Sequence, residues 1–268
     1  KIILNVLGIL LLGLSALMLF PLITDVIKNN STWISFTISL GITTSVGITL
    51  ILSTRDEVNK KLIMQDAFLL TTLSWVFVCF FGAFPFFLSD INFSFTDSIF
   101  ESMSGVTTTG STIIKDVESM PHGILIWRAL LQWLGGVGII VMALSILPVL
   151  QVGGMQVFRT ESSDTTEKIL PKTTQIASAV IIIYLVLTFA CLLSYWIFGM
   201  SFFDALIHSM TTIATGGFSS KNESLASFNI NSLEYVACLF MIIGSLPILI
   251  YLEVWNGKFK KVVNDTQI

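Results

Sequence analysis

Charged side chains are scarce in this sequence. Asp, Glu, Lys and Arg make up 12% of its 268 residues, whereas a soluble domain carries about 25%. Hydrophobic residues account for 54%, and the mean hydropathy is +0.86. This balance excludes an ordinary soluble domain and predicts an all-α polytopic membrane protein. The net charge of −3 provides no bulk basicity, so we expect membrane lipid and no nucleic acid as a partner.

Cysteine and histidine are scarce as well, with three and two residues. Cys79, Cys191 and Cys238 each lie in an apolar run, without close spacing or a nearby histidine. That pattern is typical of small hydrophobic side chains in helix contacts. The sequence has no nucleophile–base pair and no cluster with metal-ligand spacing. We therefore expect neither an enzyme nor an organic cofactor.

Long apolar runs dominate what is present. A helix needs about 20 apolar residues to cross the hydrocarbon core. We predict six transmembrane helices, roughly over residues 2–23, 33–52, 67–88, 124–150, 176–198 and 233–252.

Lysine and arginine are unevenly distributed among the connecting segments. If the N-terminus is inside, the outer side keeps only four of the 14 basic residues: Lys28, Lys115, Arg128 and Lys221. Because basic residues favour the cytoplasmic side, we predict a multi-pass protein with both termini in the cytoplasm. Trp33, Trp127 and Trp196 then fall at the outer interface, where aromatic belts form.

One stretch occurs twice, after the third and after the fifth apolar run. SFTDSIFESMSGVTTTGST begins at Ser94, and SFFDALIHSMTTIATGGFS begins at Ser201, so the copies align without a gap at an offset of 107 residues. Each has helical apolar spacing over about a dozen residues and ends in a Thr/Gly segment. Neither is long enough to span a membrane. We predict two re-entrant pore helices with filter loops, both on the outer side, within parallel helix–pore–helix repeats.

The Thr/Gly segments have the composition of a cation path. Extended backbone at membrane depth is tolerated where it lines a wet cavity. Glycine permits positive φ, which turns successive carbonyls the same way, and rings of such oxygens can replace the hydration shell of K⁺. Asp97 and Asp204 lie near the half-helix starts, where they complement the helix dipole. A glycine-rich outer hairpin after an interfacial helix is the structural alternative.

These features divide the chain into five expected parts. They are an N-terminal transmembrane helical pair over residues 1–56, a first helix–pore–helix unit over 57–152, a cytoplasmic loop over 153–175, a second unit over 176–257 and a cytoplasmic tail over 258–268.

The residues resemble those of a known family. FESMSGVTTTGST, WRALLQWLGGVGIIVMALSILPVLQVGGMQVFRTESSD and HSMTTIATGGFSSKN are similar to the Trk/Ktr/HKT superfamily of potassium uptake proteins, with the bacterial TrkH family as the nearest branch. The likeness runs along essentially the whole chain. It implies K⁺ uptake across the bacterial inner membrane through one pore surrounded by four helix–pore–helix units. The filter positions it implies here are Thr107, Thr108, Thr109, Gly110, Ala214, Thr215, Gly216 and Gly217.

The resemblance also implies partners. Family members pair as homodimers, each subunit with its own pore, and work with a cytoplasmic nucleotide-binding regulatory subunit. This sequence has two units instead of four and supplies two of the four filter strands, so we expect a missing second half, or a second copy, to complete the pore. We interpret the chain as a fragment or a split protein. A secondary transporter with broken helices and a non-conducting truncated remnant are the alternatives.

A few other residues have both a structural and a functional interpretation. Glu101 and His208 occupy matching positions on the half-helices, where hydrogen bonding around the filter is favoured over a role in permeation or pH sensing. Arg128 is expected to extend to the outer interface, with pairing to an outer acid as the alternative. The glycines of the GGVG stretch at Gly135 are attributed to close helix packing.

Overall fold

The computed structural model describes residues 1–54, 64–150, 169–246 and 250–251. Within those residues all regular structure is helical. The helices are α1 (Ile2–Leu17), α2 (Leu19–Lys28), α3 (Trp33–Leu52), α4 (Met64–Phe87), α5 (Phe95–Val106), α6 (His122–Leu150), α8 (Ile169–Ile197), α9 (Phe202–Ile213) and α10 (Asn231–Ser245), with a short 3₁₀ helix, η3 (Ser224–Phe228).

Every predicted apolar run contains helix in the part of the chain that the structure describes. The second run matches α3 at both ends, and the sixth continues past α10 into residues 247–249, which lie outside the described part of the chain. The expected domain borders near residues 56, 152 and 257 lie outside it too.

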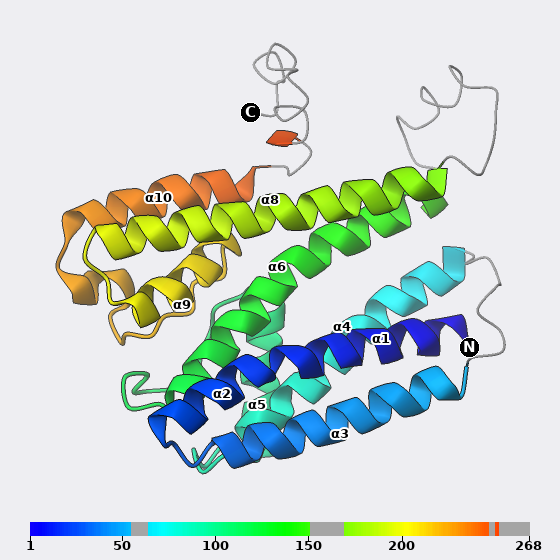
Figure 1. Ribbon diagram of the computed structural model, residues 1–268, viewed down its shortest axis with the longest axis horizontal. Coiled ribbons are helices and arrows are strands. Elements are labelled where there is room, and N and C mark those ends of the chain that lie inside the picture. The colour runs from blue at the N-terminus through cyan, green and yellow to red at the C-terminus, as the bar shows by residue number, and fades with distance from the viewer. Residues whose placement is uncertain (55–63, 151–168, 247–249, 252–268) are drawn as a thin grey trace.

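The helices run between two ends of an elongated bundle (Figure 1). The N-terminus, the end of α6 and the start of α8 lie at one end, while α5 and α9 lie toward the other. Among the residues that the structure describes, four helical stretches are long and apolar enough to cross a membrane: Ile2–Lys28, Trp33–Leu52, Gln65–Phe87 and Ser178–Ile197. The fold is thus that of a helical membrane protein in which two half-helices of 12 residues each enter from the same end.

The first run differs from the prediction of one helix. It is divided at Met18 into α1 and α2. Pro21 has no backbone N–H, so the carbonyl of Leu17, four residues earlier, receives no helical hydrogen bond from it. The interruption allows α2 to turn onto the start of α6, where the Asp25 carboxylate accepts a hydrogen bond from the Gly123 backbone at 2.7 Å.

Helix α6 lies in the middle of the molecule, between α1–α5 and α8–α10 (Figure 1). Its Trp133 packs against the apolar cores of both parts. Its Trp127, predicted at the outer interface, is instead fully buried and donates to the Gly82 carbonyl at 2.9 Å. Trp33 and Trp196 are exposed on the helix surface, as a lipid-facing position requires. Helix α6 is therefore a central helix that both half-helices can contact.

Candidate functional site

Each half-helix begins at a side-chain cap. The Ser94 hydroxyl accepts from the Asp97 backbone at 3.1 Å while the Asp97 carboxylate accepts from the Ser94 backbone at 3.0 Å, a complete capping box. Hydrogen bonds to the Asp97 carboxylate from the Ser94 hydroxyl, at 2.7 Å, and from the Ser94 backbone N–H lower the pKa of the Asp97 carboxyl. The Ser201 hydroxyl caps α9, accepting from the Asp204 backbone at 3.1 Å. The predicted half-helices are confirmed, and their caps fix where each one starts.

The two Thr/Gly segments share an unusual backbone conformation. Thr108 and Gly110 have φ of 54° and 78°, and the aligned Thr215 and Gly217 have φ of 51° and 83°. Positive φ at a β-branched residue is a genuine outlier. Both threonines are held there by a 2.9 Å hydrogen bond from their N–H to a carbonyl in the last turn of the preceding half-helix. Strain of this kind, repeated at aligned positions, is typical of functional sites.

The eight predicted filter residues lie on two segments that meet. A Cβ atom built on Gly110 would overlap the carbonyl oxygen of Gly216, so the two backbones are in direct contact. In the second segment Thr215 and Gly217 are exposed, while Ala214 and Gly216 are buried. In the first, Thr109 is exposed and Thr107, Thr108 and Gly110 are half-buried. The structure therefore brings together two stretches that are 107 residues apart in sequence.

Glu101 and His208 support the segments in equivalent ways. The Glu101 carboxylate accepts from the Thr112 hydroxyl at 2.8 Å and from the Ile113 backbone at 3.2 Å. His208 Nε2 lies 3.3 Å from the hydroxyl of Ser219, the residue that aligns with Thr112. A structural role in hydrogen bonding, the favoured interpretation of both residues, agrees with these contacts to the residues that follow the two segments.

Arg128 corrects the expectation that its side chain extends to the outer interface. Its guanidinium is buried, with Nε 2.7 Å from the Glu101 carboxylate. A second nitrogen donates to the Ser219 carbonyl at 3.2 Å, and the group lies 4.1 Å from the centre of the Phe218 ring. Burying a paired charge costs less free energy than burying a lone charge. The structure therefore supports the alternative interpretation, in which Arg128 pairs with an acid. Arg128 thereby joins the first half-helix to the end of the second segment.

Gln132, one turn further along α6, was missed by sequence reasoning. Its amide nitrogen donates to the Gly216 carbonyl at 2.8 Å, and its amide oxygen accepts from the Phe218 backbone at 3.1 Å. The side chain is fully buried, and a Cβ on Gly216 would overlap its carboxamide. The available signal was an uncharged amide side chain inside a spanning run, because polar groups at membrane depth are often functional.

Glycines let the flanking helices approach the half-helix ends. A Cβ on Gly135 would overlap the carbonyl oxygen of Val106, the last residue of α5. Gly244 of α10 has the same relation to Ile213, the last residue of α9, at 2.8 Å. The close-packing interpretation is confirmed for Gly135, whereas Gly138 has open space beside it.

The outer loops that follow the two segments are tied together at Asn222. Its side chain accepts from the Val117 backbone at 2.7 Å and donates to the Asp116 carboxylate at 3.0 Å. The hydrogen bond from Asn222 lowers the pKa of the Asp116 carboxyl. Lys221 adds an exposed ion pair with Glu118 at 3.7 Å. The two repeats therefore contact each other at the loops as well as at the segments.

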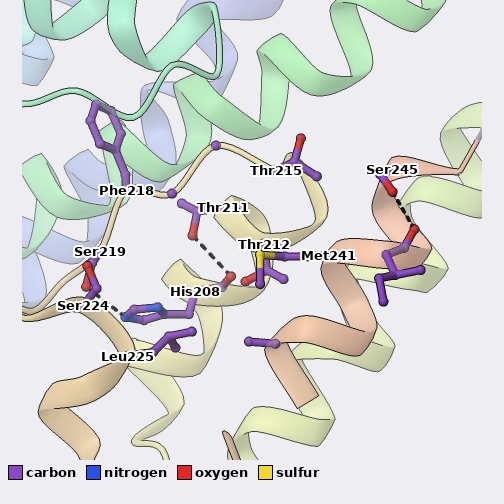
Figure 2. A pocket seen from close by; sticks show the side chains of 14 residues that line it. His208, Thr211, Thr212, Thr215, Phe218, Ser219, Ser224, Leu225, Met241 and Ser245 are labelled. Carbon is purple, nitrogen blue, oxygen red and sulfur yellow. Dashed lines mark hydrogen bonds between the residues drawn. The ribbon is translucent and has the colours of Figure 1, made fainter. Parts of the chain in front are cut away.

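A hollow of about 540 Å³ lies between the second segment and helix α10 (Figure 2). Its walls come from α9, from residues 215–219, from η3 and from α10. His208 and Thr212 line it from α9, and Met241 and Ser245 line it from α10.

Comparison with known proteins identifies the family. The family model TrkH, described as cation transport protein, matches residues 34–267. A Trk system potassium uptake protein TrkI from Halomonas elongata is 39% identical over 268 residues, covering 99% of this chain and 54% of that protein. The TrkH protein of Escherichia coli K12 is 36% identical over 261 residues, covering 96% of this chain and 54% of that protein.

A solved structure agrees with these sequence relatives. The crystal structure of the potassium transporter TrkH from Vibrio parahaemolyticus superposes with a TM-score of 0.85 at 33% identity, covering 96% of this chain and 52% of that one. The chain thus spans about half the length of the relatives it matches. With its paired half-helices and its sequence matched over almost its whole length, the chain belongs to the TrkH family of cation transport proteins.

Proposed function

We propose that this chain forms half of a K⁺-conducting path and supplies two of four filter strands, residues 107–110 and 214–217. The repeated positive φ at aligned positions supports this assignment, because it is the backbone pattern that lets successive carbonyls face one side. The relatives that match over most of the chain are named potassium uptake proteins. In this proposal the protein acts in a bacterial inner membrane with both termini in the cytoplasm.

One observation carries the proposal. The residues that line the hollow in the second unit are equivalent to the residues of the first unit that contact the second segment. Helix α10 begins 109 residues after α6, at Asn231 against His122, and Gly244 repeats the contact of Gly135. Five first-unit positions hold the second segment, and their second-unit counterparts all line the hollow. The holding residues are Gly105, Gly110, Arg128, Gln132 and Gly136, and the counterparts are Thr212, Gly217, Ala237, Met241 and Ser245.

The hollow is therefore the place where a third filter strand fits, in the same geometry that the second strand has against the first unit. In this proposal that strand comes from a missing second half, continuous with this chain or separate from it, or from a second copy of this chain. The homodimer and the cytoplasmic nucleotide-binding regulatory subunit stay predictions of the family resemblance.

The test is rescue of a potassium-uptake-deficient bacterium. We expect no growth at low K⁺ with this chain alone, and growth when the second half of a TrkH-family protein is co-expressed. The purified pair in proteoliposomes is expected to pass Rb⁺. Failure of both, with both halves present in the membrane, favours the non-conducting remnant. Saturable solute exchange without K⁺ or Rb⁺ flux favours the secondary transporter.

A further inference from the structure

We infer that Gln132 is a positioning residue for the second filter strand, so that helix α6 of the first unit sets the ion preference of the second. This inference rests on the proposed function. Its first support is the geometry: the carboxamide bonds to the backbone on both sides of Gly217, through the Gly216 carbonyl at 2.8 Å and the Phe218 N–H at 3.1 Å.

One hydrogen bond to each of the two peptide groups that flank a residue holds both peptide planes in place. Gly217 has φ of 83° and open space at its Cβ position, so no packing of its own holds its conformation. Glycine is the residue that moves most freely between backbone conformations. The Gln132 carboxamide, fully buried on a long helix, supplies the missing restraint.

The sequence difference between the two segments has the same explanation. The first segment has Thr109 where the second has Gly216. Thr109 is exposed, and its hydroxyl bonds to that of Thr107 at 2.8 Å. At position 216 any side chain would overlap the Gln132 carboxamide. The second segment has glycine at position 216 because a larger residue there would occupy the space of the Gln132 carboxamide.

The restraint belongs to one strand. The counterpart of Gln132 on α10 is Met241, and the counterpart of Arg128 is Ala237, neither of which can make such hydrogen bonds. A strand bound in the hollow would therefore pack against apolar side chains of α10 at these two positions. Helix α6 therefore donates hydrogen bonds to the strand beside it, whereas α10 has no side chain at these two positions that could do so.

Gln132→Met in the complete two-half protein tests the inference. Methionine keeps the length of the side chain and removes both hydrogen bonds. We expect K⁺ preference over Na⁺, measured as competition of Na⁺ with Rb⁺ flux in proteoliposomes, to fall roughly two- to tenfold, the equivalent of one ordinary hydrogen bond. Thr188→Val is the matched control, because it removes the 3.0 Å hydrogen bond from Trp133 of the same helix without touching the filter.

A wild-type preference retained by Gln132→Met overturns the inference, and so does an equal loss in Thr188→Val, because that would indicate general loosening of α6. If Gln132→Met does not accumulate, Gln132→Asn, which is too short to reach both backbone groups, carries the same comparison. Protection of the purified protein against thermal unfolding by K⁺ relative to Na⁺ gives a second readout. Absence of flux in the wild type counts against the proposed function, while this ion-dependent protection still decides the role of Gln132.

Discussion

The Nε atom of Arg128 lies 2.7 Å from the carboxylate of Glu101, and neither side chain is exposed to solvent. Because Arg128 also bonds to the Ser219 carbonyl, one ion pair connects the first half-helix, the central helix and the second segment. Removal of one partner leaves the other charge buried and uncompensated.

We therefore expect Arg128→Met to destabilise the protein by about 3–5 kcal/mol. The unfolding midpoint in detergent micelles measures this loss. Lys221→Met is the matched control, because its ion pair with Glu118 spans 3.7 Å at an exposed site and should contribute at most about 1 kcal/mol. The double variant Glu101→Leu with Arg128→Met should regain part of the loss. Equal effects of Arg128→Met and Lys221→Met would contradict a buried ion pair.

Gly110 and Gly217, the glycines of the proposed filter, are expected to differ in their tolerance of a side chain. Gly110→Ser and Gly217→Ser both force a side chain into the left-handed region, which costs about 1–2 kcal/mol, and both should alter K⁺-over-Na⁺ preference. Gly110→Ser should also reduce the amount of folded protein, because its Cβ would overlap the Gly216 carbonyl, whereas Gly217 has open space. Flux assays and membrane abundance measure the two effects separately. Unchanged selectivity in both variants would remove these residues from the filter.

The glycines of α6 permit a comparison within one helix. Gly135→Ala would drive a methyl group into the Val106 carbonyl, and overpacking of this kind costs about 1–3 kcal/mol. Gly138→Ala has open space beside it and should be neutral or stabilising by up to about 1 kcal/mol, because alanine is the better helix former. Thermal unfolding of the two variants tests the assignment. It is wrong if Gly138→Ala is the more damaging change.

The Asp116–Asn222 hydrogen bond predicts a pH dependence at the outer loops. The folded protein holds the pKa of Asp116 below its ordinary value of 3.8. A lowered carboxyl pKa contributes stability that is present above the ordinary value and is lost as the pH falls through the lowered one. The unfolding midpoints of wild type and Asn222→Ala, measured from about pH 7 to pH 3, should differ by a constant amount above about pH 4. Below it the difference should shrink to the part that comes from the Val117–Asn222 hydrogen bond, which does not titrate. A difference that grows on acidification would contradict this sign.

Local sequence determined the elements of this protein. Helical apolar spacing predicted both half-helices, and the structure begins them after Ser94 and after Ser201, as the repeat requires. Long apolar runs predicted the helices around them. These features depend on residues three or four positions apart, so the periodicity of the sequence reports them directly.

Only the tertiary structure decided how the two repeats are joined. Gln132 meets the second segment 84 and 86 residues later in the chain, and Arg128 meets it 91 residues later. A one-dimensional pattern assigns a buried polar side chain no partner, so Arg128 was expected at the interface and Gln132 received no role. The free energy of a buried polar group depends on what it contacts after folding, and here that contact is the backbone of a segment supplied by the other repeat.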